Sequence, residues 1–136
     1  MLLAVVGAVE VLIDKFSATS GIAIEFVHDR PLTRLTPPWE KAVYRMIQES
    51  LNNVRRHSQS LRARVELTQR EDRLEIVVRD WGIGFDPRRS GAKTFGLRSL
   101  RQRAQLLGGS LCIESSPGAG TVVRIELPLS REAGVS

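Results

Sequence analysis

The chain has 136 residues, of which 42% are hydrophobic and 26% charged, a balance that excludes a disordered polymer and predicts one globular domain with its own core. A formal net charge of +5 favours an anionic partner, such as a nucleotide, a nucleic acid or an acidic protein surface. The single cysteine, Cys112, excludes an internal disulfide and favours a reducing, cytoplasmic setting.

The first predicted element is a helix over residues 2–18 that packs against another surface, which can lie in this chain or outside it. Glu10 and Asp14 interrupt its apolar run far short of the roughly 20 residues that span a bilayer, and no basic residue precedes it as in a signal peptide. Residues 22–27 then read as a strand, and the three prolines within residues 30–38 predict a loop.

The strongest helical pattern covers residues 39–57, where apolar side chains recur at steps of three and four. Thr36 is a candidate cap, and the prolines that follow it suit a helix start. Two alternating runs, residues 63–67 and 74–78, predict a hairpin of half-buried strands separated by the polar residues 68–72.

A long loop with several glycines covers residues 79–96. The next helix is predicted by the apolar residues Leu97, Leu100, Ala104 and Leu107 and is ended by Gly108 and Gly109. Strands beginning at residues 111–113 and at Thr121 complete the chain. This order predicts an α+β fold: a two-layer sandwich with helices on one face of a mixed, mostly antiparallel sheet.

A polar stripe raises the first question of function. On the helix over residues 39–57, Glu49, Asn53 and Arg56 fall within one narrow stripe beside the apolar one. An acid and an amide one turn apart can share Mg²⁺, which prefers few protein ligands together with phosphates, and Arg56 can then meet a phosphate. A solvated polar face explains the same stripe, and this helix alone favours that explanation.

Three further features suggest a nucleotide. Asp80 ends a buried strand, and an acceptor-only carboxylate there can choose adenine's amino group over guanine's carbonyl, although a tight turn explains Asp80, Gly82 and Gly84 equally well. Gly96 precedes a helix whose free N–H groups can bind phosphate, or it belongs to a flexible loop. Thr121 is either a ladder residue or a hydroxyl that meets the same ligand as Asp80.

Together the motifs resemble the ATP-binding catalytic domain of sensor histidine kinases, in the superfamily shared with DNA gyrase, a heat-shock chaperone and mismatch-repair ATPases. More narrowly they resemble the subfamily of bacterial nitrate and membrane-fluidity sensors. The resemblance rests on "YRMIQESLNNVRRHS", "VRDWGIGFDP" and "FGLRSLRQRAQLLGGSLCIESSPGAGTVVRIELPL" and covers residues 8–129 of a single domain, 1–136. It implies the ATP-binding fold of that superfamily, called Bergerat-type.

The resemblance also implies roles for individual residues. Asn53 would hold Mg²⁺, and Glu49 would handle metal or water as the catalytic residue. Arg56 stands where the family usually has lysine. The implied ATP-binding residues are Asn53, Arg56, His57, Asp80, Gly82, Gly84, Gly96, Leu97 and Thr121. Residues 86–95 would form a lid that orders with ATP, in which Thr94 replaces a frequent glycine.

The function implied is transfer of the γ-phosphate of Mg-ATP to a histidine on a separate dimerisation domain of the same kinase, with a response regulator downstream and no membrane or nucleic-acid contact by this domain. A serine kinase of the anti-sigma-factor type and a basic nucleic-acid-binding module are the alternatives. The dimerisation domain is expected to be absent. His28 and Asp29 resemble a phosphoacceptor pair, but Pro31 would break the helix that such a pair requires.

Overall fold

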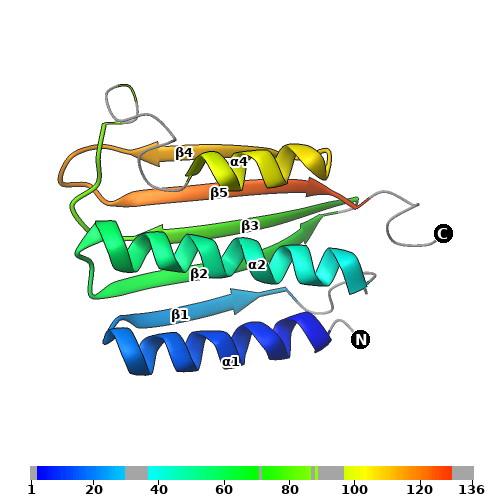
Figure 1. Ribbon diagram of the computed structural model, residues 1–136, viewed down its shortest axis with the longest axis horizontal. Helices are drawn as coiled ribbons and strands as arrows, with labels where there is room; N and C mark the ends of the chain where they lie inside the picture. The colour runs from blue at the N-terminus through cyan, green and yellow to red at the C-terminus, as the bar shows by residue number, and fades with distance from the viewer. Residues whose placement is uncertain (1–2, 30–36, 71, 87, 89–96, 130–136) are drawn as a thin grey trace.

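Alternating apolar residues build the sheet, and helical apolar stripes cover it. The computed structural model describes residues 3–29, 37–70, 72–86, 88 and 97–129 (Figure 1). The elements are, in chain order, α1 (Leu3–Ser20), β1 (Ala23–His28), α2 (Pro37–Asn53), the π-helical turn η1 (Val54–Ser58), β2 (Arg62–Arg70), β3 (Arg73–Asp80), α4 (Leu97–Leu106), β4 (Ser110–Ser115) and β5 (Thr121–Pro128).

The five strands form one mixed sheet in the order β1-β2-β3-β5-β4. β1 pairs in parallel with β2, and the remaining neighbours are antiparallel. A parallel pair needs a crossover, and α2 lies in the connection between β1 and β2. In Figure 1 all the labelled helices lie on one face of the sheet, so the predicted two-layer α+β architecture is confirmed.

The core lies between these two layers. Inward-facing strand residues such as Val65, Ile76 and Ile125 meet Met46 and Leu51 of α2, and all five are almost completely buried. The opposite face of the sheet carries ion pairs instead, among them those of Arg64 with Glu66, Arg73 with Glu126, and Arg124 with Glu75. The apolar period of two along each strand therefore separates a dry face from a solvated one.

The first helix belongs to the same core. Val9 and Ile13 are buried, and α1 contacts both α2 and β1. Its end follows from Gly21, whose φ of +77° permits the left-handed conformation that commonly ends helices. Among the helices that the structure describes, none is long and apolar enough to cross a membrane.

Several boundaries differ from the predicted ones by a residue or two, and two larger differences have a physical reason. The polar segment expected between the hairpin strands is mostly strand, because Thr68 pairs with Glu75 and Gln69 with Leu74. Polar residues can continue a strand whose outer face is solvated. The alternation of apolar and polar residues therefore predicts a strand end that is too early. The helix predicted to reach residue 57 is α-helical only to Asn53 and then widens into the π-helical turn.

Candidate functional site

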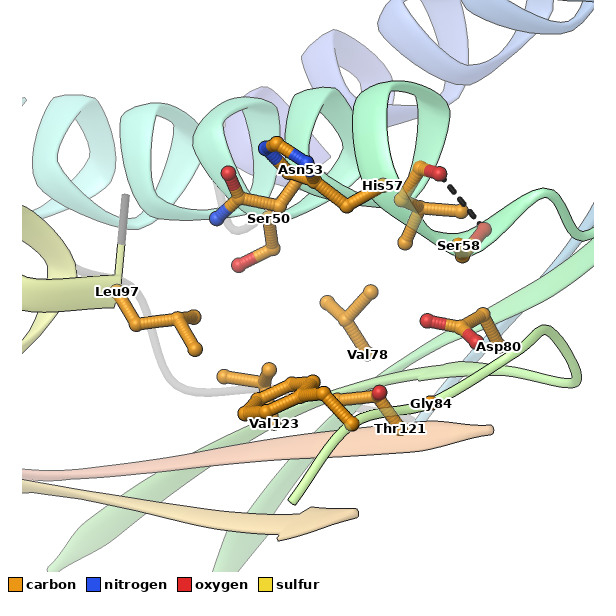
Figure 2. Close-up of a pocket in the computed structure, with 12 residues that line it drawn as sticks. Ser50, Asn53, His57, Ser58, Val78, Asp80, Gly84, Leu97, Thr121 and Val123 are labelled. Carbon is orange, nitrogen blue, oxygen red and sulfur yellow. Dashed lines mark hydrogen bonds between the residues drawn. The ribbon is translucent and has the colours of Figure 1, made fainter. Parts of the chain in front are cut away.

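A cavity opens between the end of α2 and the inner face of β3 and β5 (Figure 2). Together with its mouth, which is open to solvent, it comprises about 440 Å³ of empty space. Six of the predicted site residues line it: Asn53, His57, Asp80, Gly84, Leu97 and Thr121. Helix, strand and loop residues that are far apart in the sequence therefore converge on one hollow.

Asp80 supplies a buried acceptor to this cavity. It is the last residue of β3 and is only 5% exposed, with Oδ1 accepting a hydrogen bond of 2.9 Å from the backbone N–H of Gly82. Burial raises the pKa of the carboxyl, while hydrogen bonds from the backbone of Gly82 and Thr121 oppose the rise. Trp81 is the next residue and is partly exposed, with the Arg62 guanidinium 3.8 Å from its ring centroid. The strand end thus directs one acceptor inward.

The two glycines of this loop are required by neighbouring backbone. A Cβ at Gly82 would collide with the carbonyl oxygen of Ser58, and a Cβ at Gly84 would collide with that of Ser116. Gly84 also has a φ of +65°. The backbone N–H of Ile83 donates to the Ser58 carbonyl over 2.8 Å, which holds the loop against the end of η1. Gly84 lines the cavity, whereas Gly82 does not.

Thr121 faces the same space from the start of β5 (Figure 2). Its Oγ1 lies 2.8 Å from Oγ of Ser115, which also contacts the carbonyl oxygen of Gly120 and accepts a hydrogen bond from the backbone N–H of Phe85. This cluster connects the β4–β5 turn to the loop that follows Asp80. Ser115 is a residue that the sequence reasoning missed.

The end of α2 supplies the opposite wall, where Asn53 and His57 lie (Figure 2). In a π-helical turn the hydrogen bond spans five residues, so one turn holds more residues than in an α-helix. His57, four residues after Asn53, therefore lies on the same side of the helix as Asn53. Arg56, three residues after Asn53, lies on a different side. Arg56 is exposed and does not line the cavity, so its predicted phosphate contact stays a prediction.

Glu49 has a partner that no sequence pattern indicated. Nε of Arg103, on α4, lies 2.9 Å from its Oε1 and forms an ion pair between the two helices. Oε1 is buried, and within the described residues no donor has hydrogen-bond geometry to it, so the contact is chiefly electrostatic. Glu49 is one turn from Asn53 but does not itself line the cavity. Its predicted catalytic and metal-binding roles are not tested by this geometry.

The donor set at this end of the cavity suits a magnesium ion held mainly by nucleotide phosphates. Asn53 has an amide in the cavity wall, and Glu49 is one turn away. Within the described residues no group of three or more His, Cys, Asp and Glu side chains forms a metal cage. Mg²⁺ typically takes only one or two protein oxygens together with water and phosphate, so Asn53 fits such a site as a direct ligand.

Some predicted residues lie outside the described residues. Gly96 and most of the predicted lid, residues 87 and 89–95, belong to that group. Leu97, which begins α4, is buried and lines the cavity. His28 is on the edge strand β1, with Nδ1 3.1 Å from the carbonyl oxygen of Asp29, and is therefore not on a helix.

The remaining lining residues were not singled out by the sequence analysis: Ser50, Val54, Ser58, Val78, Phe85 and Val123. The strand period could have indicated two of them, because Val78 precedes Asp80 by two strand positions and Val123 follows Thr121 by two. The hydroxyls of Ser50 and Ser58 donate to the carbonyls of Met46 and Val54, so these serines add little polarity. The base of the cavity is accordingly apolar, as a flat aromatic ligand requires.

Known proteins are similar to this chain in sequence and in fold. DegS, a signal transduction histidine-protein kinase/phosphatase of Bacillus subtilis (strain 168), is 36% identical over 120 residues, which cover 86% of this chain and 31% of DegS. The sensor protein VraS of Staphylococcus aureus (strain COL) is 30% identical over 111 residues, which cover 82% of this chain and 32% of VraS. The chain therefore spans about a third of the length of these curated relatives.

Among solved structures, the histidine kinase domain of the blue-light activated histidine kinase from Erythrobacter litoralis EL346 matches with a TM-score of 0.70 and 25% identity, covering 89% of this chain and 59% of that one. The Acinetobacter baumannii histidine kinase AdeS matches with a TM-score of 0.75, 13% identity, and 93% and 64% coverage, and shows the fold alone. A profile of the family "Histidine kinase-, DNA gyrase B-, and HSP90-like ATPase" matches residues 40–131. The chain belongs to this family of ATPases, and its relatives include sensor histidine kinases.

Proposed function

We propose that the chain is the catalytic domain of a two-component sensor kinase, which binds Mg-ATP and donates the γ-phosphate to a histidine on a separate dimerisation domain. The observation that carries the proposal is the buried Asp80 carboxylate, which faces a cavity whose opposite wall carries Asn53. Family membership and the named kinases among the relatives support it.

Each end of the cavity suits one part of the nucleotide. Adenine presents an exocyclic amino group, and the Asp80 carboxylate is a pure acceptor placed to receive it. The apolar base formed by Val78, Phe85 and Val123 matches the faces of a purine ring. At the other end, Asn53 would hold the Mg²⁺ that screens the charge of the triphosphate.

The phosphoryl transfer itself needs little from this chain beyond positioning. In kinases most catalysis comes from alignment and electrostatic stabilisation of the transferred group, so the acceptor histidine can arrive on another domain. Glu49 lies beside the phosphate end and, in this proposal, orients the metal's water shell or the incoming group. We also propose that a response regulator receives the phosphate next.

We propose a reducing, cytoplasmic location for this domain. The exposed free thiol of Cys112 supports this location.

Titration with a fluorescent ATP analogue tests the nucleotide site. Asp80→Asn should weaken binding roughly 10- to 100-fold, because a hydrogen bond to a charged group is worth about 1.5–3 kcal/mol. Asp72→Asn is the matched control, since Asp72 is exposed in the turn between β2 and β3. Equal affinity of Asp80→Asn and the wild type would remove Asp80 from the site.

Two further measurements test the metal and the acceptor. Asn53→Ala should lower the affinity for ATP in Mg²⁺ more than it lowers the affinity for ATP in EDTA, whereas Asn52→Ala, its neighbour, should leave the difference between the two affinities as in the wild type.

With γ-labelled ATP the chain alone should take no acid-labile label, and a supplied histidine-containing dimerisation domain should become labelled. Label on this chain that disappears in His28→Ala would contradict the separate acceptor. Transfer to a serine of a partner protein would indicate the anti-sigma-factor type of kinase.

A further inference from the structure

Ser115 controls a hydroxyl of the cavity wall without lining the cavity itself. It is the last residue of β4 and lies directly across the ladder from Thr121. Its Oγ makes three contacts of nearly equal length: 2.9 Å to the carbonyl oxygen of Gly120, 2.9 Å to the backbone nitrogen of Phe85, and 2.8 Å to Oγ1 of Thr121.

The number of hydrogen atoms fixes the direction of these contacts. A serine hydroxyl has one hydrogen to donate and two lone pairs to accept with. The Gly120 carbonyl can only accept, so the Ser115 hydrogen is directed to it, and the Phe85 N–H can only donate. The remaining contact is satisfied when Thr121 donates its own hydroxyl hydrogen to Ser115. Any other arrangement leaves two oxygen lone pairs facing each other across less than 3 Å.

This assignment sets what Thr121 offers to a ligand. With its hydrogen used by Ser115, the Thr121 hydroxyl presents only lone pairs to the cavity. Asp80 is the ladder neighbour of Thr121 and is also an acceptor, so one wall carries two acceptors side by side (Figure 2). An amino group on the purine edge satisfies such a wall, while a carbonyl oxygen at the same place meets two acceptors and no donor.

We propose that Ser115 is a specificity-determining residue, which holds Thr121 as an acceptor so that the cavity takes 6-aminopurine nucleotides and excludes 6-oxopurine nucleotides. The proposal rests on the nucleotide-binding function proposed above. Ser115 acts as a positioning residue, because its effect reaches the ligand through Thr121.

Binding of ATP and of inosine triphosphate, which carries a carbonyl where ATP has the amino group, tests this proposal. The wild type should prefer ATP by at least about tenfold, since an unpaired acceptor in a buried site is costly. In Ser115→Ala the Thr121 hydroxyl is free to rotate and donate, so the preference should fall by roughly three- to tenfold. Ser115→Thr keeps the hydroxyl and should restore the preference.

Ser116→Ala is the matched control, because Ser116 is the exposed next residue, and it should keep the wild-type ratio. Thr121→Val is a second variant that serves if Ser115→Ala folds poorly. It should lose affinity for ATP but not for inosine triphosphate, so the ratio falls again. A merely structural role would lower both affinities together.

The outcomes separate the two proposals. A wild type that binds neither nucleotide overturns the proposed function. A wild type that selects ATP, with the same ratio in Ser115→Ala and in Thr121→Val, overturns the role of Ser115 alone.

Discussion

The role proposed for Asp80 would come at a cost to stability. The ionised carboxylate is the stronger acceptor for the amino group of the proposed ligand, yet burial raises the pKa of Asp80 and so favours the neutral acid. Nearby backbone N–H groups recover part of this cost. A ligand that donates to the carboxylate would recover more of it, so binding and ionisation of Asp80 are coupled.

The pH dependence of unfolding should reveal this cost. Because the folded pKa lies above the ordinary value of 3.8, the native state holds the proton more tightly than the unfolded chain. The contribution of Asp80 to stability is fully present below 3.8 and is lost as pH rises through the raised pKa. The free energy of unfolding of Asp80→Asn, measured in urea, should therefore increase relative to the wild type as pH rises. A constant difference between Asp80→Asn and the wild type across this pH range would contradict the raised pKa.

Alanine substitutions at two glycines with positive φ distinguish the cost of backbone strain from the cost of a steric collision. Gly84→Ala combines an unfavourable φ of +65° with contact against the carbonyls of Ser116 and Gly120, and should lower the free energy of unfolding by about 2–4 kcal/mol. Gly118→Ala has a similar φ of +82° but open space, and should cost only about 1–2 kcal/mol. Chemical denaturation of both variants measures the difference. Equal losses would mean that the loop moves away freely.

The sequence indicated Asp80, Asn53 and Thr121 because each stands at a fixed place in a periodic element. It did not indicate Ser115 or Arg103, because their importance lies in contacts between elements. A serine at a strand end is unremarkable until the fold places Thr121 opposite it. An arginine in a helix with several arginines has no distinguishing mark until Glu49 lies 2.9 Å away.

At the scale of elements, the ion pair between Glu49 and Arg103 connects α2 to α4. α4 begins at Leu97 in the cavity wall, so a change in α4 can reach both the proposed nucleotide site and the Glu49 carboxylate. Both side chains are partly exposed, 30% for Glu49 and 43% for Arg103, so the pair contributes modestly to stability, on the order of 0.5–1 kcal/mol. Its larger effect is on the orientation of Glu49.

Arg103→Gln should therefore affect transfer more than folding. With the proposed acceptor domain present, we expect a several-fold lower kcat with little change in affinity for ATP, and Glu49→Gln should act in the same direction. The double variant should be no worse than Glu49→Gln alone, because both changes disturb the same carboxylate. Arg98→Gln, an exposed position on the same helix, is the control. Additive losses in the double variant would separate Arg103 from Glu49.

The periodicity of apolar residues predicted most helices and strands, but it did not predict the geometry of the last helical turn of α2. Apolar spacing predicted the helix over residues 39–57, yet spacing cannot distinguish a final turn that spans four residues from one that spans five. The π-helical turn depends on packing of Val54 and Ser58, which are both buried. The parallel pairing of β1 with β2 likewise depends on tertiary contacts, because a strand pattern has no direction of its own.

At the scale of the whole molecule, the nucleotide should act as a stabilising ligand. A ligand at 100 times its Kd adds about 2.7 kcal/mol to the free energy of unfolding, so Mg-ATP should raise Tm by several degrees. Thermal unfolding with ATP in Mg²⁺, with ATP in EDTA, and with neither measures the effect. The shift should be smaller in EDTA and much reduced in Asp80→Asn. A rise of the same size in Asp80→Asn would place the nucleotide elsewhere.

Because β3 is central in the sheet, the two halves of the proposed site should differ in the free energy needed to open them. β3 is bonded on both sides, by β2 and β5, and ends at Asp80, whereas α4 covers the edge strand β4 (Figure 1). Amide exchange in a doubly paired strand requires global opening, while peripheral units open at lower free energy. We therefore expect the half of the proposed site that would recognise the base to persist as long as the native state itself. Because α4 lies at the periphery, we expect the half that carries Leu97 to open locally at lower free energy and to give a nucleotide its way into the proposed site while Asp80 stays in place.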